Sequence, residues 1–503
     1  MLKKTPTRSR GRTLLQASRL SAAHGVKAEG AASGGRFSSS WMHLLGLAAI
    51  AGPLFLFRLG TGALLNWDEA IYAEVSKEMA RSGNWLTPFW QGRPFFEKPP
   101  LAFWIQGSFF HWFGVNEFVA RAPSALAGIA VVLLTYAIAR KMAGATAGLI
   151  AALVLMTTSE FDRVARQGMT DALLCLCIYA AIYAWIRLRK EEPGWFYVAC
   201  AAVGAGAMIK GPAVLVAPLA IGVDWMLRRP REKALGWRAY GAGGLLMVAM
   251  VAPWHIWMAM QYGRPFVSDY FGLQLAERAT EVLQSAGGGP GYYAGVVLLG
   301  ALPWSVVAVV AAGKWVWRRE WDSSLVWILV GILLIGYSLL PTKHRWYILP
   351  VFPALAIEVG RLLAEAGRRW RMVLYASAVV VAAGLIGAFT TLVRRQGDPI
   401  TNQVAQMAAV AGKSGETGPL YLVKGSAAEP ELEVPTTVFY SGRPTVLLSV
   451  PADAKELAGL MQCRGLLDAL VEEDAVGYLA REYKVRRIAG NGAAAYVEVS
   501  GRR

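Results

Sequence analysis

Residues 171–190 read DALLCLCIYAAIYAWIRLRK, and this stretch predicts the class of fold. An uninterrupted apolar run follows Asp171 and ends at a group of cations that begins at Arg187. A run of this kind is typical of a helix that crosses a bilayer, and cations at one end are typical of the cytoplasmic side. We therefore expect a membrane-spanning helix with Asp171 at its outer end.

The composition of the whole chain agrees with this interpretation. Of its 503 residues, 55% are hydrophobic and only 17% are charged, whereas about 25% are charged in a typical soluble domain. The formal net charge of +17 is expected for loops that face anionic lipid. The chain is too apolar for a nucleic-acid-binding protein of this size, so we expect membrane lipids and no nucleic acid among its partners.

Other apolar segments follow the same pattern. Their approximate limits are 42–60, 122–139, 145–160, 172–187, 195–209, 211–227, 239–254, 292–313, 324–340, 346–360 and 372–392. Lys and Arg concentrate in alternate connections, at 140–141, 187–190, 228–233, 314–319 and 361–371. This bias predicts about eleven to thirteen spans, with the N-terminus in the cytoplasm and the C-terminus outside. The aromatic segment 99–116 fits only as an interfacial or re-entrant segment.

The composition also predicts three regions. Residues 1–40 are basic and form an expected disordered cytoplasmic tail, and residues 41–393 form the transmembrane body, with a first outer loop over 61–121. Residues 394–503 are not apolar enough to span, and we expect a small periplasmic α/β domain there. Its strand-like runs lie at 420–423, 436–442, 445–450 and 494–500, with helical patterns near 453–481.

The outer connections collect charged residues from separate parts of the sequence. Charges at the ends of spans are costly unless they are paired or functional, and outward cations oppose the orientation rule. An anionic ligand at the outer surface would account for them. The residues concerned are Asp68, Glu69, Glu97, Lys98, Asp171, Lys210, His255, Lys343, His344 and Arg345.

Three acids are candidates for catalysis. Asp68 and Glu69 follow the first span, where a carboxylate is suited to deprotonate an acceptor or to hold a metal ion. Paired acids at such a place are equally typical of an ordinary solvated loop. Asp171 is the third candidate, and its alternative role is to cap the helix that follows it.

Four cations are candidates for binding a phosphate. Lys98 precedes Pro99-Pro100, which restricts the backbone, and Lys210 precedes a Gly-Pro turn. Lys343 and Arg345 lie in one short outer turn, where they would clamp a phosphate well. The alternative for the lysines is to anchor a span in the headgroup region.

A divalent metal ion near the phosphate is the one cofactor that we expect. Glu97 and His255 are both predicted to face the outer side, and each residue type is a common metal ligand. The remaining ligands would have to come from the donor or from water.

Short motifs occur in a fixed order between residues 41 and 360. They are NWDEAIYAE, FFEKPPL, ARAPSALAG, ARQGMTDALL, MIKGP, ALPWS and KHRWYILPVFPALA. With these motifs the chain resembles the bacterial membrane glycosyltransferases related to protein O-mannosyltransferases, and most of all the aminoarabinose transferases that modify lipid A. The resemblance implies a GT-C fold, an α-helical polytopic membrane body with interfacial helices in its first outer loop.

The resemblance also implies roles for individual residues. Asp68 would be the acid of the first loop, Glu97 and Lys98 the pair that follows it, Asp171 a second acid, and Tyr347 a residue of the donor phosphate site. Some relatives have Tyr at the position of Phe95. The donor would be an undecaprenyl-phosphate sugar.

We therefore expect an enzyme of the bacterial inner membrane that transfers a monosaccharide from a polyprenyl phosphate to an envelope acceptor such as lipid A, with inversion, at the periplasmic face. Transfer to Ser or Thr of a protein is the alternative, and it differs only in the acceptor. A lipid transporter or flippase is less favoured, because the sequence shows neither repeat symmetry nor polar residues near the midplane of paired broken helices.

Overall fold

The structure is a computed structural model that describes residues 40–65, 67–189, 192–228, 235–277, 288–318, 324–366, 399–425, 434–450 and 452–502. The chain divides into two units, Met1–Gly52 and Pro53–Arg503. The first unit contributes the start of an apolar helix, Ser40–Leu56. The predicted tail up to residue 39 and the predicted span at 372–392 lie outside the described residues.

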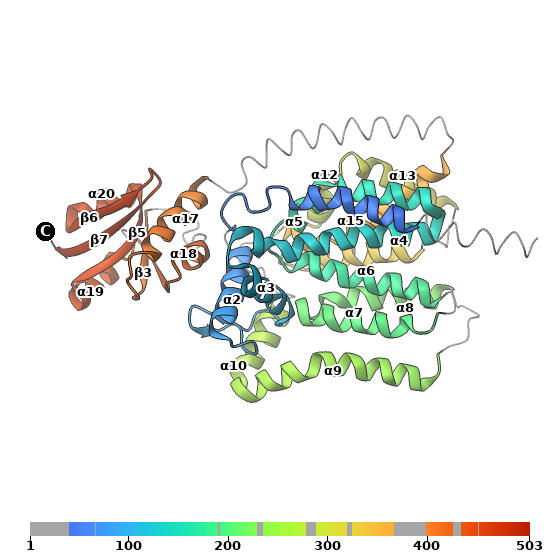
Figure 1. The fold of residues 1–503 in the computed structure, drawn as a ribbon, viewed down its shortest axis with the longest axis horizontal. Helices are drawn as coiled ribbons and strands as arrows, with labels where there is room; N and C mark the ends of the chain where they lie inside the picture. Colours follow the sequence, from blue (N-terminus) through green and yellow to red (C-terminus); the bar gives the residue numbers. More distant parts are fainter. Residues whose placement is uncertain are drawn as a thin grey trace, which may run out of the picture. The chain divides into compact units, whose positions relative to one another are not determined.

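Apolar helices make up the body of the second unit (Figure 1). They are α4 (Glu117–Met156), α6 (Asp171–Leu188), α7 (Trp195–Lys210), α8 (Val216–Arg228), α9 (Trp237–Tyr262), α12 (Tyr292–Gly300), α13 (Trp304–Arg318), α14 (Ser324–Leu339) and α15 (Val351–Glu365). Among the described residues, five helical stretches are long and apolar enough to cross a membrane, or six if α12 and α13, bent by 116°, form one broken span. The chain is therefore a multi-pass membrane protein.

The long helix α4 consists of two arms. Its backbone leaves helical geometry at Ala143 and Gly144, where the chain reverses. Gly148 then lies so close to Tyr136 that an added Cβ would come within 2.7 Å of the Tyr136 carbonyl oxygen. Only glycine permits this approach. The two arms correspond to the predicted spans 122–139 and 145–160.

A second reversal separates α7 from α8. Gly211 has a φ of 60°, which favours glycine, and a short 3₁₀ turn, η1 (Gly211–Leu215), follows it. Gly206 consequently packs against Val214. The predicted spans 195–209 and 211–227 are these two arms.

The other predicted spans that the structure describes are also apolar helices. They correspond to α6, α9, the bent pair α12 and α13, α14 and α15. Several arms are shorter than the roughly 20 residues that span a bilayer unaided. The predicted number of eleven to thirteen spans stays a prediction.

The predicted first outer loop, residues 61–121, contains two helices, α2 (Asp68–Ser82) and α3 (Leu101–Phe113), which pack against each other at one end of the body (Figure 1). A two-stranded hairpin of β1 (Phe89–Trp90) and β2 (Arg93–Pro94) lies between them in the sequence. α3 has 13 residues and is too short to span, in agreement with the interfacial interpretation of 99–116. Short helices α5 (Ser159–Ala165), α10 (Arg264–Val267), η2 (Ser268–Glu277) and η4 (Arg345–Ile348) join other elements.

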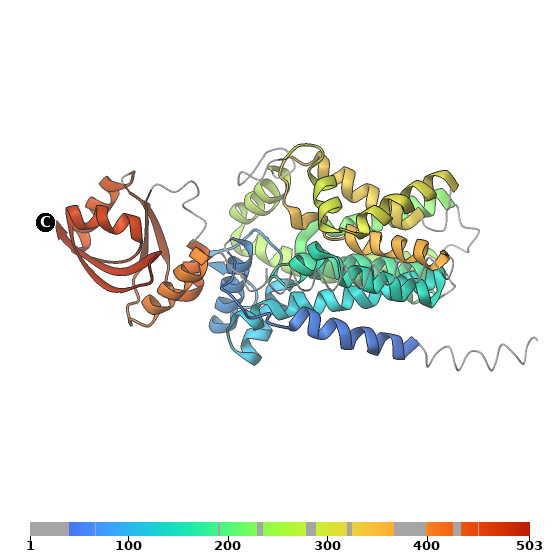
Figure 2. The same ribbon diagram turned by 90° about the horizontal axis from the view of Figure 1, so that it is seen from above.

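The C-terminal residues form a three-layer α/β domain, drawn in orange to red in Figure 2. Its described sheet has the order β4-β3-β5-β7-β6, in which β4, β3 and β5 are parallel and β7 and β6 are antiparallel to their neighbours. Helices α17 and α18 cover one face, and α19 and α20 cover the other. The bounds are β3 Leu420–Lys424, β4 Thr445–Ser449, β5 Leu466–Glu472, β6 Tyr483–Gly490, β7 Ala494–Arg502, α17 Pro399–Gly412, α18 Val434–Ser441, α19 Ala454–Arg464 and α20 Glu473–Glu482.

The predicted helical membrane body with a small α/β domain is confirmed, but one predicted strand is wrong. Residues 436–442 form most of helix α18. Their β-branched and aromatic side chains favour a strand locally, yet Phe439 packs with Leu64 and Ala73 of the first outer loop, and this packing overrides the local preference. Strand β5 also lies within the region predicted as helical.

Candidate functional site

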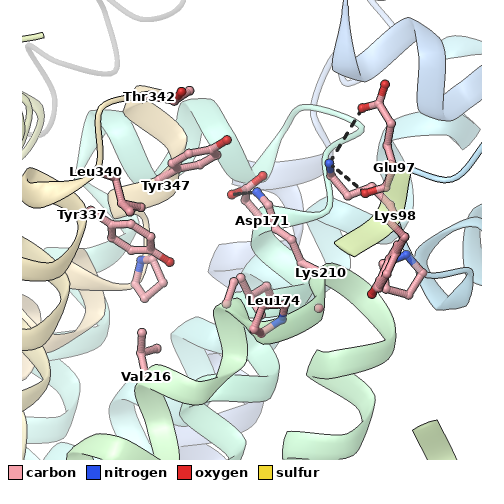
Figure 3. A pocket seen from close by; sticks show the side chains of 16 residues that line it. Glu97, Lys98, Asp171, Leu174, Lys210, Val216, Tyr337, Leu340, Thr342 and Tyr347 are labelled. Carbon is pink, nitrogen blue, oxygen red and sulfur yellow. Dashed lines mark hydrogen bonds and ion pairs between the residues drawn. The ribbon is translucent and has the colours of Figure 1, made fainter. Parts of the chain in front are cut away.

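A cavity of about 330 Å³ opens where the first outer loop meets the ends of several body helices (Figure 3). Its walls come from the residues before α3, the start of α6, the turn between α7 and α8, η2, α14 and the turn before α15. The polar residues of these walls are Glu97, Lys98, Asp171, Lys210, Tyr270, Tyr337, Thr342 and Tyr347.

An ion pair between Asp171 and Lys210 lies in the middle of the cavity in Figure 3. Lys210 Nζ donates to Asp171 Oδ1 over 2.6 Å, and the two side chains are only 12% and 4% exposed. α6 begins at Asp171 and the packed helix α7 ends at Lys210, so their antiparallel course brings the two charges together. Asp171 Oδ2 is buried and has no hydrogen-bond partner among the described residues. No described protein group therefore satisfies this buried oxygen.

Lys98 supplies a second ammonium group to the cavity. Its Nζ donates to the Glu97 carbonyl oxygen over 3.3 Å and lies 4.0 Å from Glu97 Oε2. Lys98 is buried, and the prolines after it lead directly into α3. It lies close enough to Asp171 to act on that carboxylate electrostatically. Two ammonium groups, Lys98 and Lys210, thus face the cavity beside two carboxylates, Glu97 and Asp171.

Asp68 is the first residue of α2 and is partly exposed. The preceding Trp67 has a φ of 66°, so the chain turns sharply into the helix. Asp68 is near enough to Asp171 for the two carboxylates to interact electrostatically, although it is not part of the cavity wall. The structure therefore brings Asp68, Asp171, Lys98 and Lys210 together, as the sequence predicts.

Glu69 has a different environment from its neighbour. It is 1% exposed, and its Oε1 accepts hydrogen bonds from Arg121 Nε and from Gly168 N, both over 2.8 Å. Its Oε2 accepts from Leu65 N over 2.6 Å. Glu69 thereby joins the start of α2 to α4 and to the segment before α6. These bonds favour a structural role over the predicted catalytic one.

The predicted phosphate-binding residues before α15 do not all lie at the cavity. Tyr347 lines the cavity, as Figure 3 shows. Lys343 is not part of its wall, and its Nζ donates to the Leu340 carbonyl oxygen over 2.6 Å. Arg345 donates from Nη2 to Glu160 Oε2 over 2.6 Å and from Nε to Oε1 over 3.0 Å. Of the three predicted phosphate-binding residues of this turn, the structure brings Tyr347 to the cavity and leaves the two cations outside its wall.

The predicted metal ligands do not form a metal centre. Glu97 lines the cavity, but both ring nitrogens of His255 have protein partners, Val251 O at 2.8 Å and the Tyr270 hydroxyl at 3.2 Å. Within the part of the chain that the structure describes, no group of three or more His, Cys, Asp or Glu side chains is placed to hold a metal ion.

Three polar residues of the cavity wall were not predicted from the sequence, Tyr270, Tyr337 and Thr342. Burial raises the pKa of the Tyr270 hydroxyl above its ordinary value, so this group stays neutral and acts as a hydrogen-bonding group. Tyr337 lies in an otherwise apolar helix, where a hydroxyl among aliphatic residues was the only available signal.

Comparisons with known proteins agree with this picture. Residues 97–257 match the family model described as dolichyl-phosphate-mannose-protein mannosyltransferase. The undecaprenyl phosphate-alpha-4-amino-4-deoxy-L-arabinose arabinosyl transferase of Erwinia tasmaniensis is 31% identical over 353 residues, which cover 67% of this chain and 62% of that protein. The chain thus spans less than two thirds of the length of this relative.

Two solved structures share the fold. ArnT from Cupriavidus metallidurans bound to undecaprenyl phosphate matches 90% of this chain and 97% of its own, with 21% identity and a TM-score of 0.73. The Archaeoglobus fulgidus oligosaccharyltransferase in complex with Zn and sulfate matches 90% of this chain and 72% of its own, with 11% identity and a TM-score of 0.51. The chain therefore has the fold of the GT-C membrane glycosyltransferases and is similar, over 67% of its length, to the arabinosyl transferase of Erwinia tasmaniensis.

Proposed function

We propose that this protein transfers a sugar from a polyprenyl phosphate to an envelope glycolipid such as lipid A. The observation that carries the proposal is the convergence of Lys98 and Lys210 on a cavity that also holds the buried Asp171. Lys210 pairs with the buried Asp171, whereas Lys98 lies 4.0 Å from the more exposed Glu97, so a phosphate could take the place of the Glu97 carboxylate beside Lys98. The named relative, a transferase for an undecaprenyl-phosphate sugar, supports the same donor class.

The proposed chemistry is a single displacement. Asp68 takes the proton from the acceptor hydroxyl as its oxygen forms a bond to the anomeric carbon of the donor sugar. The bond between that carbon and the phosphate oxygen breaks, and the polyprenyl phosphate leaves with the electron pair. Lys98 and Lys210 stabilise its added negative charge. Attack opposite to the phosphate inverts the anomeric centre.

Asp171 has a supporting role in this proposal. One of its oxygens holds Lys210 in place, and the other, Oδ2, is free to accept a hydrogen bond from a hydroxyl of the sugar. Tyr347 lies beside this pair, with Lys210 Nζ 4.9 Å from its ring centre, and completes the wall on the donor side.

We also propose the orientation of the chain. Asp171 and Lys210 lie at one end of α6 and α7, and Arg187 and Arg189 lie at the other end of α6. The positive-inside rule makes the arginine end cytoplasmic. The site and the C-terminal domain, with proposed bounds 394–503, would then be periplasmic. A divalent metal ion, predicted with Glu97 and His255 as ligands, has no step in this proposal.

A second candidate function is transfer to Ser or Thr of a protein. The match of residues 97–257 to the protein mannosyltransferase model favours it. The donor site and the chemistry would be the same, and only the acceptor would differ.

An assay with purified protein in lipid nanodiscs tests these alternatives. The donor is undecaprenyl-phosphate 4-amino-4-deoxy-L-arabinose with a radiolabelled sugar, and the acceptors are lipid A and a synthetic Ser/Thr-rich peptide. We expect label to move to lipid A. Label on the peptide alone would support the second candidate, and no transfer from this donor or from a polyprenyl-phosphate hexose would contradict both.

A further inference from the structure

A second cavity, of about 620 Å³, lies between the first outer loop and the C-terminal domain. The hairpin β1–β2 and the residues that follow it form one wall, the start of β4 forms another, and η2 contributes Asp269. Its polar and aromatic lining includes Trp90, Gln91, Arg93, Glu97, Asp269 and Thr445.

The C-terminal domain is held firmly beside this cavity. Lys77 of α2 donates to the Phe439 carbonyl oxygen over 2.7 Å, and its side chain is only 2% exposed. Tyr440 accepts a hydrogen bond from Leu64 N over 3.0 Å and donates one to Glu117 Oε1 over 2.8 Å. These buried bonds make the wall that this domain supplies a fixed part of the cavity.

The two cavities share a boundary. Glu97 lines both, and Lys98, the next residue, lines the first cavity. Asp269 lines the second cavity and the adjacent Tyr270 lines the first. A molecule in the second cavity therefore lies directly beside the donor site. Since a transfer reaction needs two substrates next to each other, this is a suitable place for the acceptor.

The lining of the second cavity suits a sugar. The carboxylates of Glu97 and Asp269 and the amide of Gln91 accept hydrogen bonds from hydroxyls, and the Arg93 guanidinium donates them. Trp90 offers an apolar ring surface that can pack against sugar C–H groups. The lining also includes the apolar Pro94, Phe95, Phe96, Pro444 and Val446, but a lipid chain would cover the charged groups of Arg93, Glu97 and Asp269 without offering them hydrogen bonds.

A peptide strand fits this cavity less well. β4 is an edge strand of the described sheet, and a peptide could in principle pair with it. However, Thr445 N already donates to Gln91 Oε1 over 3.1 Å, and Ser449 N donates to Asp453 Oδ2 over 2.7 Å. Side chains thus occupy both ends of the strand edge.

We propose that the second cavity binds the sugar headgroup of the acceptor glycolipid and that the C-terminal domain, through the start of β4, helps to select it. This inference rests on the proposed function and names the acceptor side of the same reaction. It gives the C-terminal domain a role in substrate choice.

The test measures initial rates of sugar transfer by full-length protein in nanodiscs, with lipid A and the labelled donor varied independently. The variants are Arg93→Ala, Asp269→Asn and Val446→Trp, the last of which fills the cavity from the β4 side. We expect the KM for lipid A to rise about tenfold or more in each, with the donor KM and kcat within about twofold of the wild type. Arg486→Ala and Glu482→Gln, exposed positions elsewhere in the same domain, are the matched controls.

The outcomes are distinguishable. An unchanged lipid A KM in all three variants, or an equal rise in the donor KM, would overturn the inference and leave the proposed function intact. A wild-type protein that transfers no sugar to lipid A would overturn both. Thermal midpoints of the variants, compared with the controls, show whether the folded state is retained, and Arg93→Ala and Asp269→Asn keep the test decisive if the Trp variant does not fold.

Discussion

The ammonium group of Lys210 lies 2.6 Å from the carboxylate of Asp171, and this pair connects the end of α7 to the start of α6. Both side chains are largely buried, so each charge depends on the other for compensation. Only one oxygen of Asp171 is used. The pair thus has a structural function and leaves a polar group available to a ligand.

Lys210→Met should therefore reduce both stability and activity. It leaves Asp171 buried without a partner, which costs about 3–5 kcal/mol of the free energy of unfolding, and it removes a cation from the donor phosphate. The double variant Asp171→Asn/Lys210→Met should recover most of the stability and none of the activity. Thermal unfolding in detergent and the transfer assay measure the two effects. Recovery of activity in the double variant would show that Lys210 does not bind the phosphate.

A substitution at Glu69 should reduce stability but not activity. Glu69→Gln should leave the Arg121 guanidinium without its buried counter-charge and lower the free energy of unfolding by about 3–5 kcal/mol. The protein that remains folded should keep a kcat near that of the wild type, because Glu69 does not reach the cavity. Rates normalised to the folded fraction provide the measurement. A normalised kcat reduced a hundredfold or more would restore Glu69 as a catalytic residue.

Sequence patterns predicted the membrane body because long apolar runs have few alternatives to a helix in a bilayer. They also placed Asp68, Lys98, Asp171 and Lys210 on one side, because the ends of consecutive antiparallel helices alternate between two surfaces. In the structure Lys210 pairs with Asp171, Lys98 lines the same cavity, and Asp68 lies outside its wall but close enough to act electrostatically on Asp171.

The sequence did not show which distant residues each side chain contacts. Arg345 looked like a phosphate ligand, but Glu160, far away in the chain, already holds its guanidinium. Phe439 lies in a strand-like run, but its packing partners in the first outer loop make that run a helix. Both cases depend on long-range contacts, which a local pattern does not contain.

The proposed orientation makes its own prediction. Reporter fusions after Lys141, Lys190, Lys233 and Arg319 should be cytoplasmic, and a fusion at Arg503 should be periplasmic, because cations concentrate in the connections expected inside. Alkaline phosphatase and green fluorescent protein fusions report the two sides with opposite signals. A cytoplasmic Arg503 fusion would contradict the parity of the spans and the location of the site.

The buried carboxyl group of Asp162 should make the stability of the protein depend on pH. Its carboxylate is buried in α5, and neither oxygen has a hydrogen-bond partner among the described residues. Burial raises the pKa of Asp162 from 3.8 to about 7, and the nearby charge of Arg166 only partly opposes this rise. Between these two pH values the folded state keeps a proton that the unfolded state has lost, so the contribution of Asp162 to stability decreases as pH rises and levels off above about 7.

Asp162→Asn should remove this dependence. In the wild type, the contribution of Asp162 lowers the free energy of unfolding by up to about 1.4 kcal/mol for each unit of rising pH. In the variant this contribution should be absent. The variant should therefore exceed the wild type in stability most clearly near neutral pH. Thermal midpoints in detergent between pH 4 and pH 8 give the comparison. Parallel curves for the two proteins would show that the buried carboxyl does not titrate in this range.

Asp68 carries the most direct test of the mechanism. Loss of a general base typically lowers the rate by about 10²–10⁴-fold, so Asp68→Asn should nearly abolish turnover. The side chain is partly exposed and keeps its size in the variant, so folding and donor binding should be unaffected. Glu78→Gln on the same helix is the matched control and should retain activity. Titration of donor binding and single-turnover transfer rates separate the two effects. If Asp68→Asn transfers sugar at a near-normal rate, the base lies elsewhere, and Asp171, which lines the cavity and has an unsatisfied Oδ2, becomes the leading candidate.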